Sequence, residues 1–470
     1  MVIPALLSEL RAIVGESAVI DTVDAAAPYL VDWRERYSGA ALAIVKPATT
    51  EEVSRVVALC ARNRVPLVPQ GGNTGLAGGA TPLTDGRDIV LNLSRMNRVR
   101  DLDPANDTIT VEAGCILQRV QEAALSADRL FPLSLASQGS CEIGGNLATN
   151  AGGVHVLRYG TMRDLVLGLE VVLPDGRTWN GLRALRKDNS GYDLKHLFIG
   201  AEGTLGVITA AVLKLFPRPR VAVVCWVAFA SVAAAVELLS ALRGRFGERV
   251  SAFEIVGLPA LELVLMHIPS ARNPLSTAAQ WFGLLEVTDS FDGYDLALAV
   301  ETELSDAARK GLISDAAIAH SDTQANAFWA LRENISEAQK IDGISIKHDI
   351  SVPVSRSPEF LARADLALRR EFPDLRIVAF GHLGDGNLHY NLSKPESADN
   401  ATFISQTGRV NRIVHDLVGE LGGSISAEHG LGQLKREEIL RYKSALEIEL
   451  MKAVKTALDP AGLFNRGKLL

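Results

Sequence analysis

Three histidines and one glutamate in the later part of the chain carry the groups best suited to chemistry. His382 and His389 flank the run Leu383-Gly384-Asp385-Gly386-Asn387-Leu388, and Glu428-His429-Gly430 follows further along. Two imidazoles and a carboxylate suit a divalent metal that keeps open coordination positions. From residue types alone, an ordinary loop that holds core or surface histidines stays open as the alternative.

The spacing of the two histidines predicts how they approach each other. Seven positions separate His382 from His389, which is too many for neighbouring turns of one helix. Asp385-Gly386-Asn387 favours a tight turn, because Asp and Asn stabilise turns and Gly tolerates positive φ. We therefore expect two strands joined by that turn, the first over Ile377–Gly381. Glu428 must then arrive from a distant loop.

Glycine-rich loops form the second chemical signal, and they gather in the first half of the chain. They are Pro69-Gln70-Gly71-Gly72-Asn73-Thr74-Gly75, the stretch 139–153 and the stretch 200–208. Consecutive glycines can turn several backbone N–H groups toward one phosphate and let it approach without a Cβ in the way. One such loop alone fits a surface turn equally well. Three such loops in one α/β unit favour a long, phosphate-bearing ligand. The Rossmann alternative lacks support, because the sequence has no G-x-G-x-x-G motif after a predicted strand.

Apolar runs between glycines and prolines predict the elements that position these groups. The first half favours a helix over Thr50–Asn63, capped by Thr50, and strands over Ala41–Val45, Val65–Pro69, 88–92, 108–112, Leu165–Leu173 and Gly206–Leu215. Two prolines in Phe216-Pro217-Arg218-Pro219 indicate a boundary. Beyond it we expect a second α+β domain with strands over Ala222–Phe229 and Trp281–Val287, helices over Ser231–Arg243 and Tyr294–Leu304, and mostly helix over 402–457.

Composition sets the outer limits. The 470 residues exceed the roughly 250–300 at which one core stops growing, so at least two packed units are expected. A net charge of -7 argues against nucleic acid, and no uncharged apolar run reaches the roughly 18 residues of a membrane span. The N-terminus lacks the basic start of a signal peptide. The 4 cysteines are too scattered for a disulfide framework, which favours a cytoplasmic location.

The order of motifs resembles a known family. PQGGNTG, SCEIGGNLATNAGG, RYGTMRD and GAEGTLGVIT follow one another as in the PCMH-type FAD-binding domain of the vanillyl-alcohol-oxidase superfamily, over about Ser38 to Lys468. The closest branch contains D-2-hydroxyglutarate and D-lactate/glycolate dehydrogenases. The resemblance implies an α+β fold: a two-subdomain FAD-binding domain over 1–217 (core about 38–217), an antiparallel-sheet, ferredoxin-like cap over 218–425 and a C-terminal helical segment over 426–470 that returns to the FAD domain.

The resemblance also implies which residues hold FAD. The expected contacts come from the glycine-rich motifs and the C-terminal end: Pro69, Gly71, Gly72, Asn73, Thr74, Gly75, Gly139, Ser140, Gly144, Gly145, Asn146, Thr149, Asn150, Gly152, Gly153, Tyr159, Gly160, Glu202, Gly206, Ile208 and Asn465. The family often has Asn-Pro at this end, whereas this chain has Asn465-Arg466. We expect non-covalent FAD, because no histidine precedes His155 and Cys141 is the only cysteine in the glycine clusters.

By the same resemblance, His382, His389 and Glu428 would be the metal ligands, with zinc preferred over manganese, and His429 would be the general base. Arg332 and Ser336, four apart in the helical stretch Ala325–Lys340, would share a face. With Lys347 in the strand-like ISIKHDISVP they would bind a carboxylate, and Asn391 would also contact the substrate. Taken by itself, this Arg and Ser pair could equally be an ordinary solvated helix face.

These expectations together indicate an FAD-dependent dehydrogenase that oxidises a D-2-hydroxy acid, first of all D-2-hydroxyglutarate to 2-oxoglutarate. A D-lactate or glycolate dehydrogenase of the same fold is the nearest alternative, and a flavin-binding subunit without chemistry is the alternative from another class. The expected electron acceptor is an electron-transferring flavoprotein or a quinone-linked carrier. A homodimer is one assembly that the sequence allows.

Overall fold

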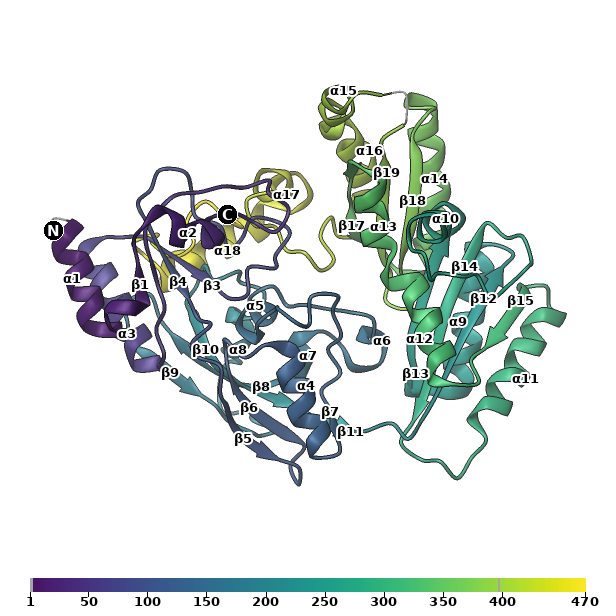
Figure 1. Ribbon diagram of the computed structural model, residues 1–470, viewed down its shortest axis with the longest axis horizontal. Helices are drawn as coiled ribbons and strands as arrows, with labels where there is room; N and C mark the ends of the chain where they lie inside the picture. The colour runs from purple at the N-terminus through teal and green to yellow at the C-terminus, as the bar shows by residue number, and fades with distance from the viewer. Residues whose placement is uncertain (1–2, 396–397) are drawn as a thin grey trace. The chain divides into compact units, whose positions relative to one another are not determined.

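The computed structural model describes residues 3–395 and 398–470 and divides into two compact units (Figure 1). The first unit combines residues 3–153 with Gly160–Arg218 and Glu428–Leu470, so it joins an early and a late segment of the chain. The second unit combines Val154–Tyr159 with Pro219–Ala427. The chain therefore leaves the first unit twice, once for the short excursion at 154–159 and once for the whole second unit.

The first sheet of the first unit follows the strand order β1-β2-β4-β3. Strands β2, β4 and β3 run parallel, while β1 pairs antiparallel with β2. Helices α1 (Ile3–Val14) and α3 (Thr50–Asn63) pack their apolar faces into the same core. The helix cap is one residue earlier than predicted: Thr49, not Thr50, accepts the Glu52 amide hydrogen. The bounds are β1 Val19–Ile20, β2 Ala41–Val45, β3 Leu67–Gln70, β4 Asp88–Asn92 and α2 Val23–Leu30.

The second sheet of the first unit follows the order β5-β6-β10-β8-β9 and is antiparallel throughout. Its strands are β5 Val99–Asp103, β6 Thr108–Glu112, β8 Val166–Val172, β9 Thr178–Gly181 and β10 Val207–Lys214, and a small pair joins β7 Arg129–Leu130 to β11 Phe216–Pro217. The helices of this part are α4 Leu117–Ser126, α5 Ile143–Ala148, α7 Met162–Leu165 and α8 Lys195–Phe198. The predicted glycine-rich stretch 139–153 contains α5, and the stretch 200–208 begins after α8 and runs into the start of β10.

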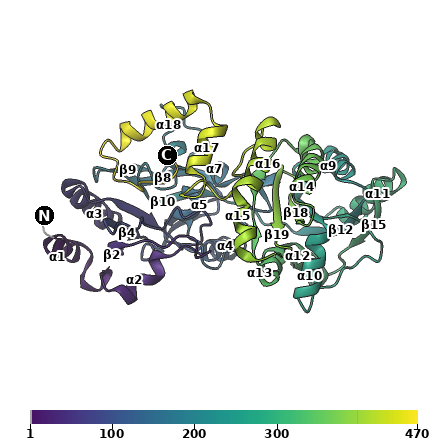
Figure 2. The same cartoon turned by 90° about the horizontal axis from the view of Figure 1, so that it is seen from above.

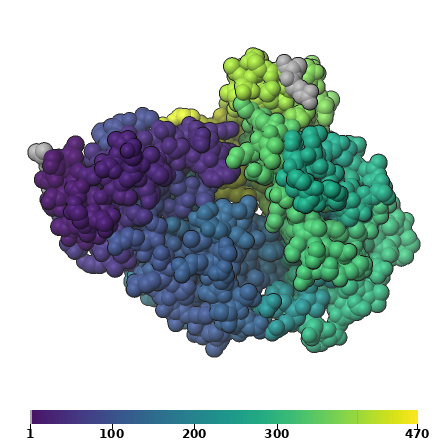
Figure 3. All heavy atoms as spheres, in the orientation of Figure 1, coloured from purple at the N-terminus to yellow at the C-terminus, as the bar shows by residue number. Residues whose placement is uncertain are grey.

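The C-terminal segment contributes α17 (Arg436–Tyr442) and α18 (Ala445–Leu458) to the first unit. After α18 the chain pairs with β3, because the Leu67 amide donates to the Leu463 carbonyl and the Asn465 amide donates to the Leu67 carbonyl. On the face drawn in Figure 3, the first unit shows mainly its purple and blue residues and little of the yellow C-terminal segment. Phe464 and Lys468 are buried.

The second unit is built on one antiparallel sheet with the order β15-β12-β14-β13-β18-β19-β16, and β17 also pairs with β19. Its strands are β12 Val221–Phe229, β13 Val250–Gly257, β14 Trp281–Asp289, β15 Ile313–Ile318, β16 Ser345–Ile346, β17 Asp349–Ser351, β18 Arg376–His382 and β19 Asn387–Ser393. The predicted antiparallel sheet is confirmed. Side chains alternate between the two faces along each strand, so each face of the sheet packs against one layer of helices.

Helices cover both faces of this sheet. Figure 2 shows α9 and α14 on one side and α10, α12 and α13 on the other. Trp226, Phe282 and Phe380 point from the strands into the core under α10, α12 and α13. The helices are α6 Val156–Tyr159, α9 Val232–Phe246, α10 Leu258–His267, α11 Leu296–Arg309, α12 Asp322–Glu333, α13 Ile335–Asp342, α14 Ser357–Glu371, α15 Asn400–Ser405 and α16 Thr407–Glu420.

Two sequence-based element predictions need correction. The helical stretch Ala325–Lys340 is two helices, α12 and α13, that meet at Asn334, where the amide side chain donates back to the Ala330 carbonyl. Such local bonding is typical of Asn at helix ends. The strand predicted around Lys347 is also interrupted: β16 ends at Ile346 and β17 begins at Asp349.

All 4 cysteines, Cys60, Cys115, Cys141 and Cys225, are free and buried. Among the helices of residues 3–395 and 398–470, none combines the length and the apolar character that crossing a membrane requires.

Trp226 provides a test of the second core. Its side chain is 0% exposed and stacks on Phe282, but its indole N–H has no hydrogen-bond partner in the described part of the chain. We expect Trp226→Ala to lower the free energy of unfolding by about 3–5 kcal/mol, measured by denaturant titration with circular dichroism. Trp226→Phe should cost clearly less, since it keeps the ring and removes an unsatisfied donor. Leu366→Ala, at a site 74% exposed, is the control and should change little. Equal losses in the two Trp226 variants would contradict this account.

Candidate functional site

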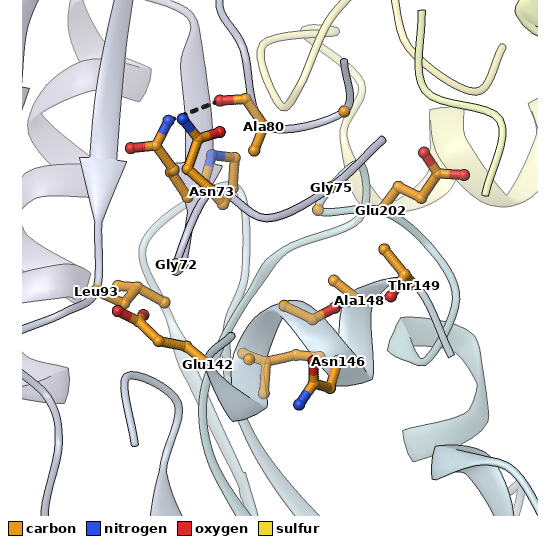
Figure 4. Close-up of a pocket in the computed structure, with 18 of the residues that line it drawn as sticks. Gly72, Asn73, Gly75, Ala80, Leu93, Glu142, Asn146, Ala148, Thr149 and Glu202 are labelled. Carbon is orange, nitrogen blue, oxygen red and sulfur yellow. Dashed lines mark hydrogen bonds between the residues drawn. The ribbon is translucent and has the colours of Figure 1, made fainter. Parts of the chain in front are cut away.

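A pocket in the first unit is lined by the glycine-rich loops (Figure 4). It brings together most of the residues that the sequence proposed for FAD: Pro69, Gly71, Gly72, Asn73, Thr74, Gly75, Gly144, Gly145, Asn146, Thr149, Glu202, Gly206 and Ile208. These come from three stretches that are far apart in sequence. His429, proposed as the general base, also lines this pocket.

The remaining residues proposed for FAD lie outside the pocket lining: Gly139, Ser140, Asn150, Gly152, Gly153, Tyr159, Gly160 and Asn465. Several of them have structural contacts instead. Asn150 accepts the Arg163 amide hydrogen through its side chain. Tyr159 belongs to α6 of the second unit, where its ring lies against Arg158.

Close backbone approach explains why the loops are rich in glycine. A Cβ on Gly72 would lie 2.1 Å from the Ser140 carbonyl oxygen, so any side chain there would push the first and second loops apart. A Cβ on Gly144 would lie 2.8 Å from the Cβ of Ala113. At these two positions the glycine is required by packing between loops, beyond any role toward a ligand.

The C-terminal end supports the pocket from behind its lining. The Asn465 side-chain nitrogen donates to the carbonyls of Gly79, at 2.9 Å, and Glu202, at 2.6 Å. Arg466, which stands where the family often has proline, forms ion pairs with Asp85 and Asp88. The departure from the family pattern therefore leaves this end firmly held in the first unit.

Glu202 fixes the loop that carries His429. Its carboxylate accepts the backbone N–H groups of Leu431 and Gly432, each at 2.8 Å. Burial raises the pKa of Glu202, and these two amide donors act in the opposite direction. The structure thus gives this glutamate a clear anchoring contact within the protein, in addition to its place in the pocket lining.

Glu142 is a pocket residue that the sequence reasoning missed. It is buried, and its Oε2 atom lies 3.3 Å from where a Cβ on Gly71 would be. That oxygen has no hydrogen-bond partner among the described residues. Burial raises the pKa of Glu142 to about 8, with Lys46 opposing the rise. Figure 4 draws Glu142 and Glu202 at opposite ends of the pocket. An acidic residue inside a glycine-rich motif was the signal that could have found it.

The second unit contains the predicted histidine hairpin. β18 ends at His382, a turn follows over 383–386, and β19 begins at Asn387. The register pairs Phe380 with His389, so His382 and His389 lie diagonally on one face of the ladder, with ring centroids 5.7 Å apart. Gly386 adopts φ 84° in the turn, and a Cβ there would meet the Val352 carbonyl oxygen at 2.1 Å.

Polar groups surround the two histidines within the second unit. Asp349 is paired in register with His389, and its Oδ1 atom lies 3.9 Å from the His389 Nδ1 atom. His382 Nδ1 lies 2.7 Å from Glu254 Oε1, and Arg332 Nε donates to Glu254 Oε2 at 2.6 Å. The histidines, Arg332 and two buried carboxylates therefore form one polar cluster on this sheet.

The other residues proposed for the substrate have different surroundings. Ser336 is exposed on α13, beyond the break at Asn334, and Lys347 is half-buried between β16 and β17. Asn391 is buried: its side-chain oxygen accepts the His348 amide hydrogen, and its nitrogen donates to Gln339.

Comparison with known proteins places the chain in a family. Residues 218–469 match the family described as FAD linked oxidases, C-terminal domain, and residues 41–181 match the FAD binding domain. This chain belongs to the FAD-linked oxidases. FAD is accordingly its cofactor.

Among its relatives, D-2-hydroxyglutarate dehydrogenase, mitochondrial, of Arabidopsis thaliana is 38% identical over 99% of this chain and 81% of its own length. The rat protein of the same name is 39% identical over 94% of this chain and 80% of its own length. D-2-hydroxyglutarate dehydrogenase of Xanthomonas citri pv. viticola is 39% identical over 93% of this chain and 91% of its own length.

Solved structures agree on the fold. p-Cresol methylhydroxylase has a TM-score of 0.77 at 19% identity and covers 99% of this chain and 96% of its own. 4-Ethylphenol oxidase from Gulosibacter chungangensis has a TM-score of 0.74 at 20% identity with the same coverage. At this level of identity the likeness establishes the fold alone.

We expect Glu142 to make FAD binding sensitive to pH. Burial raises the pKa of the Glu142 carboxyl to about 8, and an ionised carboxylate there would repel the negatively charged phosphates of FAD bound in the same pocket. FAD should therefore keep Glu142 protonated, and affinity should fall as pH rises through about 8, by at most about tenfold per pH unit for one proton. Titrating FAD into apoprotein across this range, with flavin fluorescence, measures the slope. Glu142→Gln should flatten it, and an unchanged slope in that variant would refute the assignment.

Proposed function

We propose that this chain is an FAD-dependent dehydrogenase that oxidises D-2-hydroxyglutarate to 2-oxoglutarate. The observation that carries the proposal is near-full-length similarity to proteins named D-2-hydroxyglutarate dehydrogenase from a plant, a mammal and a bacterium, at 38–39% identity. A polar cluster with two histidines, an arginine and a pair of carboxylates supports a hydroxy-acid substrate. Fold similarity alone would not choose a substrate.

We assign the chemical tasks to three ranges of the sequence. Residues 1–217 bind FAD, residues 218–425 bind the substrate, and residues 426–470 complete the FAD domain. The pocket of glycine-rich loops supports the first assignment. The histidine hairpin and Arg332 support the second. FAD is bound non-covalently in this proposal, because burial raises the pKa of the Cys141 thiol and so disfavours the reactive thiolate.

His382, His389 and Glu428 are the proposed ligands of one divalent metal, with zinc preferred. They offer two imidazole nitrogens and one carboxylate oxygen, a donor set that suits this ion. His382 fits the role because the Glu254 carboxylate at its Nδ1 favours the tautomer whose lone pair lies on Nε2, the atom that would bind a metal. Glu428 directly follows Ala427, whose amide donates to the Asp349 carbonyl beside His389 in the second unit.

Each of these residues has its own role in the proposed oxidation. Bound FAD supplies the two-electron acceptor for the C2 hydride, and a bound metal supplies Lewis acidity toward the 2-hydroxyl. His429 takes the hydroxyl proton on its imidazole nitrogen, for which its place in the pocket lining suits it. Arg332 presents its terminal nitrogens to a substrate carboxylate, with Ser336, Lys347 and Asn391 as further binding groups.

The remaining partners are proposed from the family likeness. The reduced protein would pass electrons to an electron-transferring flavoprotein or a quinone-linked carrier, and a homodimer is the proposed assembly. A cytoplasmic location remains our proposal, although the names of several relatives place those proteins in mitochondria.

Substrate identity is tested by anaerobic titration of the purified yellow protein with D-2-hydroxyglutarate, D-lactate, glycolate and their L-isomers where they exist. We expect D-2-hydroxyglutarate to bleach the flavin fastest, because the arginine and lysine can hold a second carboxylate. Faster bleaching by D-lactate or glycolate would move the assignment to that dehydrogenase. No bleaching by any of these acids in metal-loaded protein would favour a flavin-binding subunit without chemistry.

The metal and base roles are separated by two variants. His389→Ala should lose metal and turnover while keeping FAD, because the glycine-rich loops lie in the other unit. His429→Ala should keep metal and FAD but slow flavin reduction by roughly 10²–10⁴-fold, as expected for a general base. Metal analysis by mass spectrometry and stopped-flow absorbance measure both. Full metal in His389→Ala, or lost metal in His429→Ala, would contradict the assignment.

A further inference from the structure

Glu254, on β13, makes two charged contacts in the core of the second unit. It is 0% exposed, and each carboxylate oxygen has its own partner. Oε1 lies 2.7 Å from His382 Nδ1, and Oε2 accepts the Arg332 Nε hydrogen at 2.6 Å. One carboxylate thus joins a proposed metal ligand to a proposed substrate-binding group.

We propose that Glu254 is a positioning residue that holds His382 ready to bind the metal and Arg332 ready to bind the substrate carboxylate. The inference rests on the function proposed above and adds a residue to its site. It accounts for how two groups with different tasks acquire a fixed mutual geometry.

The contact with His382 selects the useful form of the imidazole. A carboxylate at Nδ1 favours the tautomer that carries its hydrogen there, which leaves the lone pair of Nε2 for a metal. In this structure Arg332 Nη2 lies 3.5 Å from that same Nε2 atom. The arginine therefore reaches the immediate surroundings of the atom that would bind the metal.

The contact with Arg332 fixes its charge and its direction. Glu254 engages only Nε of Arg332. Nη2 lies 3.5 Å from His382 Nε2 in this structure, and once a metal took that nitrogen, Nη1 and Nη2 could together make a bidentate contact with a carboxylate. The guanidinium carbon also lies 5.0 Å from the centre of the Phe380 ring, which supports the flat group from one side. Arg332 is only 7% exposed, and a buried arginine without an anion beside it would be costly.

Strand register explains how Glu254 reaches its partners. β13 pairs with β18 through Ile255 with Gly381 and Val256 with Phe380, which carries Glu254 to the His382 end of the ladder. Glu254 and Val256 share a face of β13 by strand alternation, and Val256 packs in the core under α12. The end of α12 supplies Arg332 over that face.

A purely structural role fits this cluster poorly. Replacing a buried ion pair with well-packed apolar residues is often neutral or stabilising. Three buried polar groups in one place are therefore a poor way to gain stability alone. They are a good way to hold a histidine nitrogen and two guanidinium nitrogens in fixed directions.

The test is Glu254→Gln in the full-length, FAD-loaded protein. The amide keeps one acceptor but turns a donor toward either His382 or Arg332, both of which need an acceptor. We expect zinc affinity to fall by roughly 10–100-fold, measured by competition with a chromophoric chelator. The KM for D-2-hydroxyglutarate should stay raised when zinc is restored to saturation, whereas kcat should largely recover. Flavin content should not change.

Glu286→Gln is the matched control. Glu286 lies on the neighbouring strand β14 and is partly buried, with Ser251, Trp329 and His155 as partners. It should keep the zinc affinity and KM of the natural protein. Equal zinc losses in the two variants would overturn the proposal, because they would reflect general loosening of the unit. If Glu254→Gln does not fold, Glu254→Asp serves in its place, with a loss in the same direction expected and unchanged zinc affinity and KM counting against the proposal.

Failure of this inference can be told from failure of the proposed function. If natural protein binds zinc and His389→Ala loses it, but Glu254→Gln keeps full zinc affinity and KM, only the role of Glu254 is wrong. If natural protein binds no divalent metal, the metal site itself is wrong and the role of Glu254 falls with it.

Discussion

The anchoring of the C-terminal segment by Glu202 is the contact on which the first unit's pocket depends. Its carboxylate accepts two consecutive backbone hydrogens, from Leu431 and Gly432, at 2.8 Å each. Two charge-assisted hydrogen bonds to one buried carboxylate offset part of the cost of burying it. Because His429 lies just before these residues, the same contact sets where its imidazole enters the pocket lining. The chain leaves this unit for more than two hundred residues and returns to this anchor.

Buried carboxylates recur where function requires a fixed direction. Glu202 directs backbone in the first unit, and Glu254 directs two side chains in the second. Glu142 differs, since its Oε2 has no partner among the residues described and burial raises its pKa to about 8. Satisfied carboxylates give rigidity, whereas an unsatisfied one beside a ligand pocket gives sensitivity to charge.

Close packing of backbone gives the pocket its other constraint. The first and second glycine-rich loops approach so closely at Gly72 that a single methyl group would overlap the Ser140 carbonyl. The same condition holds at the hairpin turn, where Gly386 lies against Val352. Glycine at such positions is needed for the fold itself, apart from any contact with a ligand, because the shape of the pocket depends on this close approach of backbone segments.

The sequence by itself determined the elements whose signals are local. The glycine-rich loops, the strand up to His382 and the turn at Gly386 follow from backbone conformations that nearest neighbours dictate. Tertiary structure alone decided the pairings between distant segments: Glu254 with His382 and Arg332, and Glu202 with the loop after His429. A lone glutamate in an apolar strand carries no local signal of its partners, because strand register and helix docking bring them together. Hydrophobic periodicity also did not predict the helix break at Asn334, because α12 and α13 continue the same pattern of apolar residues.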